Sequence, residues 1–178
     1  RTSVTNYYVY LISSLPALSF GARPPFSFDR FLSYCEGLVS DEDMSLIRSA
    51  GNAGLNCLAV KNTTHKKLAA FETMLRNELV KIRASRKKVD PAKYLRGEEC
   101  PESIHAAHIA VNAYRKQSLL EAEKALDQER WARLEELAIG RYFDMDILII
   151  YACKLLILER WSKIQSAQTH KMLEEVLN

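Results

Sequence analysis

The longest run of apolar positions lies near the C-terminal end of the chain. Residues 147–153 are all apolar, and after Lys154 the run resumes at residues 155–158. A transmembrane helix needs about 20 consecutive apolar residues, and a buried strand is much shorter than this stretch. The pattern therefore predicts a core helix over Asp144–Gln165, with Asp144 as its N-cap.

Two more segments show clear helical patterns. Apolar residues at helical spacing predict an amphipathic helix over His65–Arg86; they are Leu68, Phe71, Leu75, Leu79 and Ile82. Ser118, followed three residues later by Glu121, matches a capping box and predicts a long helix over Ser118–Ala138. Between these two helices we expect a mobile polar linker over Val89–Pro101 and a helix over Glu102–Lys116.

The N-terminal part is predicted to form short helices. Asn6–Leu18 is rich in tyrosine and β-branched residues, which favour a strand, but a lone strand would have no ladder partner. We therefore expect a short helix there. Ser27 is placed to cap a helix that ends at about Gly37, and Ser40 to cap another that continues to about Gly51.

These elements predict an all-α protein. We expect a helical bundle built around Asp144–Gln165, His65–Arg86 and Ser118–Ala138. Residues 1–60 would form a smaller N-terminal helical region and residues 61–178 the main bundle, together one continuous globular unit.

Composition narrows the class of protein only a little. The chain has 178 residues, of which 48% are hydrophobic and 26% charged, as in an ordinary globular protein. A net charge of +3 does not by itself indicate nucleic acid or membrane binding. The four cysteines are widely spaced and Cys153 lies inside the predicted core helix, so we expect a reduced, cytoplasmic protein without a signal peptide.

Charged residues on predicted apolar faces indicate an ionic network. Glu123, Asp127 and Arg130 fall within the apolar arc of the helix over Ser118–Ala138, and Lys154 interrupts the core helix. Unpaired buried charge is costly, so Lys154 is predicted either to pair with Asp127 or Glu123, or to reach water along its alkyl stem. The sequence leaves both alternatives open.

A second charged feature is basic and lies at the end of a helix. Arg83, Arg86, Lys87 and Lys88 follow one another where the helix over His65–Arg86 meets the linker. Cations suit this end of a helix, so a solvated face explains them first. They are also the candidate partner-binding residues of the chain.

Evidence for catalysis or metal binding is thin. His105 and His108 could share a metal with Cys100, but no fourth ligand has suitable spacing, and ordinary surface histidines are preferred. The sequence contains no Gly-rich phosphate loop and no nucleophile or metalloprotease motif. We therefore expect no enzymatic activity and no cofactor.

Several segments together resemble a known family. They are Leu75–Leu79, Glu121–Asp127 with Arg130 and Trp131, Gly140–Asp144 continuing through Leu156–Trp161, and the opening Asn6–Pro16. With these segments the chain resembles an uncharacterised bacterial family encoded beside the subunits of V-type ATPases. The last helix is also similar to the closing segment of the C/d family of V-type ATPase subunits, whose place the bacterial family would take. Members of the C/d family are all-helical, sit on the membrane rotor ring and receive the central stalk. This chain is much shorter than those proteins.

The resemblance implies a non-catalytic accessory or rotor/stalk-coupling subunit of a bacterial proton- or sodium-translocating V-type ATPase. Its partners would be subunits of the central stalk or the membrane rotor ring. The protein would then be cytoplasmic and peripheral to the inner membrane, which it would contact only indirectly through the complex. The alternative is a helical nucleic-acid-binding protein that uses the basic segment 76–88. We expect no nucleic-acid binding near physiological salt.

Overall fold

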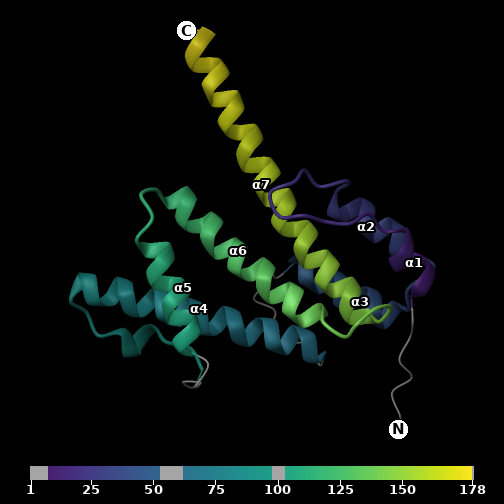
Figure 1. Ribbon diagram of the computed structural model, residues 1–178, viewed down its shortest axis with the longest axis horizontal. Coiled ribbons are helices and arrows are strands. Elements are labelled where there is room, and N and C mark those ends of the chain that lie inside the picture. Colours follow the sequence, from purple (N-terminus) through teal and green to yellow (C-terminus); the bar gives the residue numbers. More distant parts are fainter. Residues whose placement is uncertain (1–7, 53–61, 98–102, 178) are drawn as a thin grey trace. The chain divides into compact units, whose positions relative to one another are not determined.

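The computed structural model describes residues 8–52, 62–97 and 103–177, and every regular element in these ranges is a helix (Figure 1). They comprise seven α-helices and one short 3₁₀ helix, so the all-α prediction is confirmed. The chain forms two compact units. Unit 1 consists of the residues up to Gly54 together with those from Leu137 onward, and unit 2 consists of Leu55–Glu136.

Unit 1 is built on the last helix, α7 (Met145–Leu177), which packs against α2 (Phe28–Cys35) and α3 (Asp41–Asn52). The short helix α1 (Val9–Ser14) also belongs to this unit. The buried core is apolar and draws on all four helices; it includes Leu11, Phe31, Cys35, Ile47, Leu148, Ala152 and Leu155. The two cysteines that the structure describes, Cys35 and Cys153, are free and buried. Burial raises the pKa of the Cys35 thiol to about 12, so the thiol stays protonated and unreactive at neutral pH.

The predicted helix starts of unit 1 are confirmed by hydrogen bonds. The backbone N–H of Arg30 donates to Ser27 Oγ at 3.2 Å, and that of Asp43 donates to Ser40 Oγ at 3.3 Å. At the start of α7, the N–H of Ile147 donates to Asp144 Oδ1 at 3.2 Å. Each of these oxygens satisfies a backbone donor that the first helical turn would otherwise leave without a partner.

Helix α7 extends farther than the apolar pattern indicates. The predicted helix ended at Gln165, and the observed one continues to Leu177. From Gln165 to Thr169 all side chains are exposed, so burial does not mark this part of the helix. The segment contains helix formers and neither Gly nor Pro, and the backbone continues in its helical conformation.

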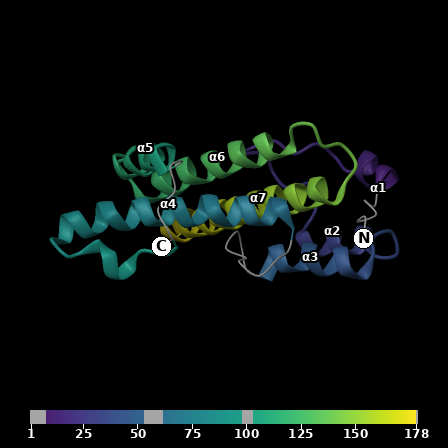
Figure 2. The same cartoon turned by 90° about the horizontal axis from the view of Figure 1, so that it is seen from below.

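Unit 2 is a compact group of helices around α4 (Thr63–Lys87), against which α5 (Ser103–Tyr114) and the 3₁₀ helix η2 (Pro91–Tyr94) pack (Figure 2). Helix α6 (Leu119–Ala138) contributes all but its last two residues to this unit. Its apolar core is made by side chains from α4, α5 and α6; the buried members are Phe71, Leu75, Ile109, Ala110, Ala113 and Leu126. Three of the six come from α5, and two of those are alanines, which allow its backbone close to α4.

This division differs from the predicted one. The sequence suggested a main bundle over residues 61–178, but the last helix shares a compact unit with the N-terminal helices. Leu148, Ala152 and Leu155 of α7 lie in one cluster with Phe31 and Ile47. The sequence pattern marks which face of a helix is buried; it does not name the helix that covers that face.

Candidate functional site

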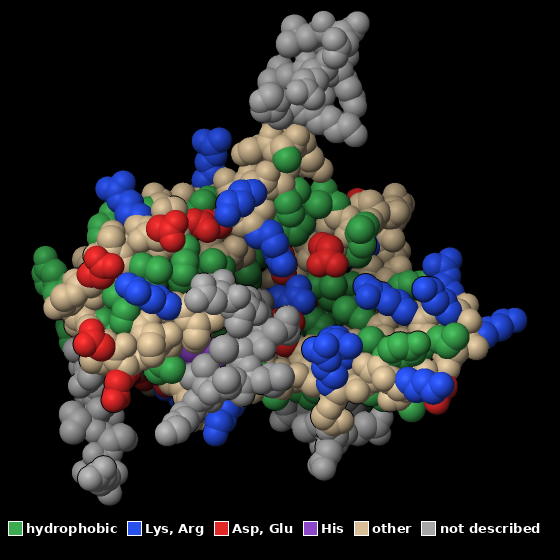
Figure 3. Space-filling model, turned by 180° about the vertical axis from the view of Figure 1, so that it is seen from behind, with side chains coloured by type: hydrophobic (Ala, Val, Ile, Leu, Met, Phe, Trp, Pro, Cys, Tyr) green, Lys and Arg blue, Asp and Glu red, His purple; other side chains and the backbone are tan. Residues whose placement is uncertain are grey.

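The predicted basic segment forms the C-terminal end of α4. Arg83, Arg86, Lys87 and Lys88 are all exposed, and none of them makes an ion pair with a residue that the structure describes. On the face shown in Figure 3, lysine and arginine side chains gather over the end of α4 and the segment after it, at the right of the view. Because these charges are not neutralised within the described part of unit 2, they present a positive field to a partner.

The end of α4 is held in one conformation. Lys88 adopts a left-handed backbone conformation with φ 55°, and its N–H donates to the carbonyl oxygens of Ala84 and Ser85. The N–H of Val89 donates to Ala84 O at 3.1 Å, which closes the helix in the manner of a Schellman motif. The guanidinium of Arg86 lies 5.7 Å from the ring centroid of Tyr114 on α5. The basic end is therefore an ordered helix terminus.

The linker after α4 was predicted to be mobile, and its described part is anchored to α4. Arg76 Nη1 donates to the carbonyl oxygen of Tyr94 at 3.0 Å. The side chain of Asn77 donates to Arg96 O at 2.7 Å and accepts from Arg96 N at 3.0 Å. Residues 98–102 lie outside the described part of the chain. A single asparagine thus fixes the path of the linker along the helix, a contact that composition does not indicate.

The predicted ionic network exists in part. Arg130 Nη1 donates to Asp127 Oδ1 at 2.9 Å, as the shared helix face suggested. The same guanidinium also donates to both carboxylate oxygens of Glu72 on α4, at 2.7 Å and 3.2 Å. Asp127 is fully buried and Glu72 nearly so. Burial alone lowers the pKa of Arg130, but hydrogen bonds and the charges of Glu72 and Asp127 outweigh it and raise that pKa.

Glu72 was missed in the sequence although a signal for it was present. It lies between Leu68, Phe71 and Leu75 on the predicted apolar stripe, where a carboxylate needs a partner as much as Asp127 does. Glu123, which was predicted to join the network, makes no ion pair with any described residue. Lys154 belongs to unit 1 and lines a cleft beside Tyr151. Its predicted pairing with Asp127 or Glu123 in unit 2 stays a prediction.

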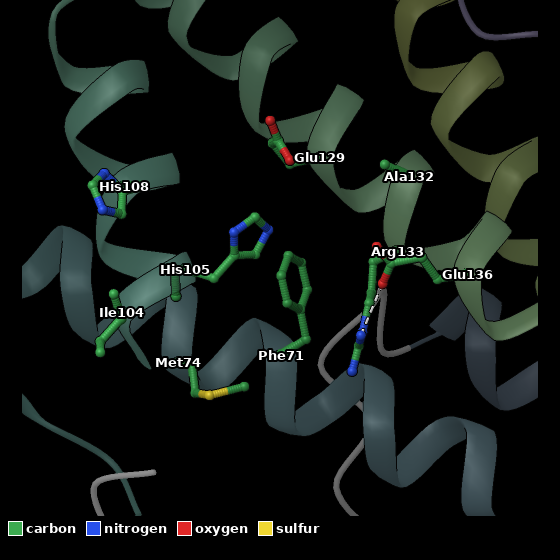
Figure 4. A pocket seen from close by; sticks show the side chains of 10 residues that line it. Phe71, Met74, Ile104, His105, His108, Glu129, Ala132, Arg133 and Glu136 are labelled. Carbon is green, nitrogen blue, oxygen red and sulfur yellow. Dashed lines mark hydrogen bonds and ion pairs between the residues drawn. The ribbon is translucent and has the colours of Figure 1, made fainter. Parts of the chain in front are cut away.

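The largest described hollow of unit 2 is a cleft of about 550 Å³ between α4, α5 and α6 (Figure 4). His105 points into it toward Phe71, and Arg133 lies on the opposite side with its guanidinium 6.0 Å from the Phe71 ring centroid. Arg133 also pairs with Glu136 at 2.9 Å. The cleft therefore has an apolar floor and a charged rim, and its lining contains no serine, threonine or cysteine nucleophile.

The metal hypothesis finds no support in the described residues. They contain no group of three or more histidine, cysteine, aspartate or glutamate side chains that could hold a metal ion. His105 and His108 are both exposed at the cleft, as surface histidines would be. Cys100, the third candidate ligand, lies outside the described residues. Within the described chain, no helix is long and apolar enough to cross a membrane.

The fold and the site define an all-α protein whose most prominent surface feature is a basic helix end and whose interior carries an ionic cluster. The chain belongs to a family described as a protein of unknown function, DUF2764, whose model matches residues 59–178. Neither a curated protein nor a solved structure matches the chain.

Proposed function

We propose that this protein is a non-catalytic accessory or coupling subunit of a bacterial V-type ATPase. In this proposal the basic end of α4 docks on an acidic surface of a protein of the central stalk or the rotor ring. The observation that carries the docking site is the row of exposed cations Arg83, Arg86, Lys87 and Lys88 on an ordered helix end. Complementary charge of this kind chiefly sets the orientation and the association rate of a complex.

The segments that resemble V-type ATPase-associated proteins supply packing residues. Leu75 on α4, Leu126 on α6 and Leu148 on α7 are buried, and each lies in one of those segments. The resemblance therefore supports a shared helical framework. It assigns no chemistry to a particular side chain, which agrees with a role in assembly rather than catalysis.

The alternative function, nucleic-acid binding through residues 76–88, has less of its segment available. Arg76 donates to the Tyr94 carbonyl oxygen, and Lys81 pairs with Glu78 at 2.9 Å. The cations left for a partner are thus confined to the last turn of α4 and its cap. A protein that tracks a phosphate backbone uses a longer basic stripe than this.

The test is recovery of partners from cells with the whole tagged chain. Two substitutions, Arg83→Glu and Lys88→Glu, reverse charge at the basic end and leave the Arg86–Tyr114 contact in place. Lys66→Glu with Lys67→Glu makes the same change at two exposed positions in the first turns of the same helix. We expect V-type ATPase subunits to be recovered with the unaltered protein and with the Lys66/Lys67 control, and to be reduced by the basic-end pair.

Melting temperatures of both variants should stay close to that of the unaltered protein, because all four side chains are exposed. The opposite result would be retention of DNA or RNA near physiological salt with no ATPase subunit recovered. That result would replace the coupling-subunit proposal with the nucleic-acid alternative.

A further inference from the structure

The corner between α5 and α6 exposes large apolar side chains to water. α5 ends at Tyr114 and α6 begins at Leu119. The side chain of Leu119 is 76% exposed, and Tyr114 and Leu120 are 43% and 37% exposed. Two adjacent leucines in water at one corner are unusual enough to indicate an interaction surface.

The backbone holds these leucines in a fixed position. Ser118 caps α6: its side-chain oxygen accepts from Glu121 N at 3.1 Å and its carbonyl oxygen accepts from Ala122 N at 3.0 Å. On the α5 side, Arg115 N donates to Val111 O at 3.1 Å and Lys116 N to Ala113 O at 3.2 Å. The exposed leucines therefore belong to an ordered helix start and not to a frayed end.

Cations border the same corner. Arg115 and Lys116 are exposed directly before the turn, and Lys124 lies one helical turn after Leu120 on the same side of α6. The three cations line a polar notch of about 510 Å³ with a single acidic side chain, Glu121, in its lining. The notch carries a net charge of +2, and neither leucine lines it.

We propose that this α5–α6 corner binds the surface of an anionic lipid bilayer. Lipid phosphates would occupy the notch of Arg115, Lys116 and Lys124, while Leu119 and Leu120 enter the interface beside it. Phosphate and hydrocarbon lie at successive depths of a bilayer, which matches cations and leucines set side by side. An acidic protein would find a polar notch without an apolar anchor. The inference goes beyond the proposed function, in which contact with the membrane is only indirect.

Vesicle co-sedimentation of the whole purified chain tests this inference without any ATPase subunit. The probes are vesicles of phosphatidylcholine alone and vesicles of phosphatidylcholine and phosphatidylglycerol in equal amounts. We expect sedimentation with the mixed vesicles and little with phosphatidylcholine alone. Each cation near an anionic surface contributes enough that Arg115→Gln with Lys116→Gln should weaken binding by about 30-fold.

The apolar part of the contact needs its own variants. Leu119→Asp should weaken binding to the mixed vesicles by at least about tenfold, because burying a leucine is worth a tenfold change or more. Leu119→Trp should retain binding, since tryptophan favours the membrane interface. An acidic protein partner that contacts only the cations would not distinguish these two variants.

Two matched variants guard against bulk charge and general stickiness. Lys66→Gln with Lys67→Gln removes the same charge from another exposed site of unit 2, and Leu38→Asp alters another exposed leucine, in unit 1. Both should bind like the unaltered chain. Equal loss in the Lys66/Lys67 control, or no preference for phosphatidylglycerol at about 0.15 M salt, would overturn the inference. Because ATPase subunits are absent from this assay, its failure leaves the proposed function untouched.

Discussion

The two units of the molecule differ in what they bury. All the buried polar or charged residues that the structure describes lie in unit 2; they are Thr64, His65, Glu72 and Asp127. The described core of unit 1 is apolar and includes Phe31, Ile47 and Leu155. Apolar burial is non-directional and roughly proportional to area, whereas a buried charge depends on a particular partner. Unit 2 should therefore be the more sensitive to loss of one specific side chain.

The largest expected effect comes from removing the shared cation of unit 2. Arg130→Met leaves the carboxylates of Glu72 and Asp127 without the guanidinium that binds both, and should destabilise the protein by about 3–5 kcal/mol. The measurement is urea unfolding. Arg133→Met is the control, because its partner Glu136 is largely exposed and such a pair is worth about 0–1 kcal/mol.

A double-mutant cycle with Glu72→Gln sharpens this test. Glu72 and Arg130 are 58 positions apart in the sequence and in direct contact, so their coupling should exceed about 0.5 kcal/mol. Additive single effects would mean that the buried cluster does not act as a unit, and the contrast between the two interiors would lose its basis.

In unit 1 we expect the loss to follow burial and not partner identity. Leu155→Ala should cost about 2–5 kcal/mol, because the side chain is fully buried in the apolar core. Leu156→Ala, one position along α7, should cost clearly less, since Leu156 is only half-buried. Chemical unfolding of both variants measures the difference. Equal losses would show that the two faces of α7 are packed alike.

The third effect is a dependence of stability on pH that arises in unit 2. His65 is buried, and burial lowers its pKa below the ordinary value of about 6.5. Between the two pKa values the unfolded chain binds more protons than the folded one. The free energy of unfolding should therefore fall by about 1.4 kcal/mol for each pH unit below about 6.5, until the folded-state pKa is reached.

His65→Phe removes this titration and should flatten the dependence of stability on pH on the acidic side of about pH 6.5. The exposed His105 provides the control, and His105→Gln should leave the pH profile as it is. Urea unfolding at a series of pH values measures both profiles. An unchanged profile in His65→Phe would assign the acid sensitivity to other groups.

The smallest effects concern two left-handed backbone positions, one in each unit. Lys88 in unit 2 has φ 55°, where a side chain is disfavoured, and Lys88→Gly should stabilise the protein by about 1 kcal/mol. Gly37 in unit 1 has φ 76° with open space around it, so Gly37→Ala should destabilise by about the same amount through the backbone alone. Thermal melting measures both; equal signs for the two substitutions would contradict this account.

Much of the fold is readable from the sequence where the deciding interactions are local. Ser27, Ser40, Ser118 and Asp144 were predicted to start helices, and each side-chain oxygen accepts from the backbone N–H three residues later. A cap of this kind is decided within one turn of the chain. The pairing of Asp127 with Arg130 is local for the same reason, because residues three apart share a helix face.

The sequence by itself thus determined an all-helical chain, the starts of most helices and the basic end of α4. Only the tertiary structure decided that α7 shares a unit with α2 and α3, that Glu72 completes the buried cluster, and that Asn77 anchors the linker at Arg96. The Asn77 and Glu72 contacts join residues 19 and 58 positions apart. Apolar periodicity identifies a buried face, but many faces are alike in hydrophobicity, and the choice among them depends on the fit of shapes and charges in the folded protein.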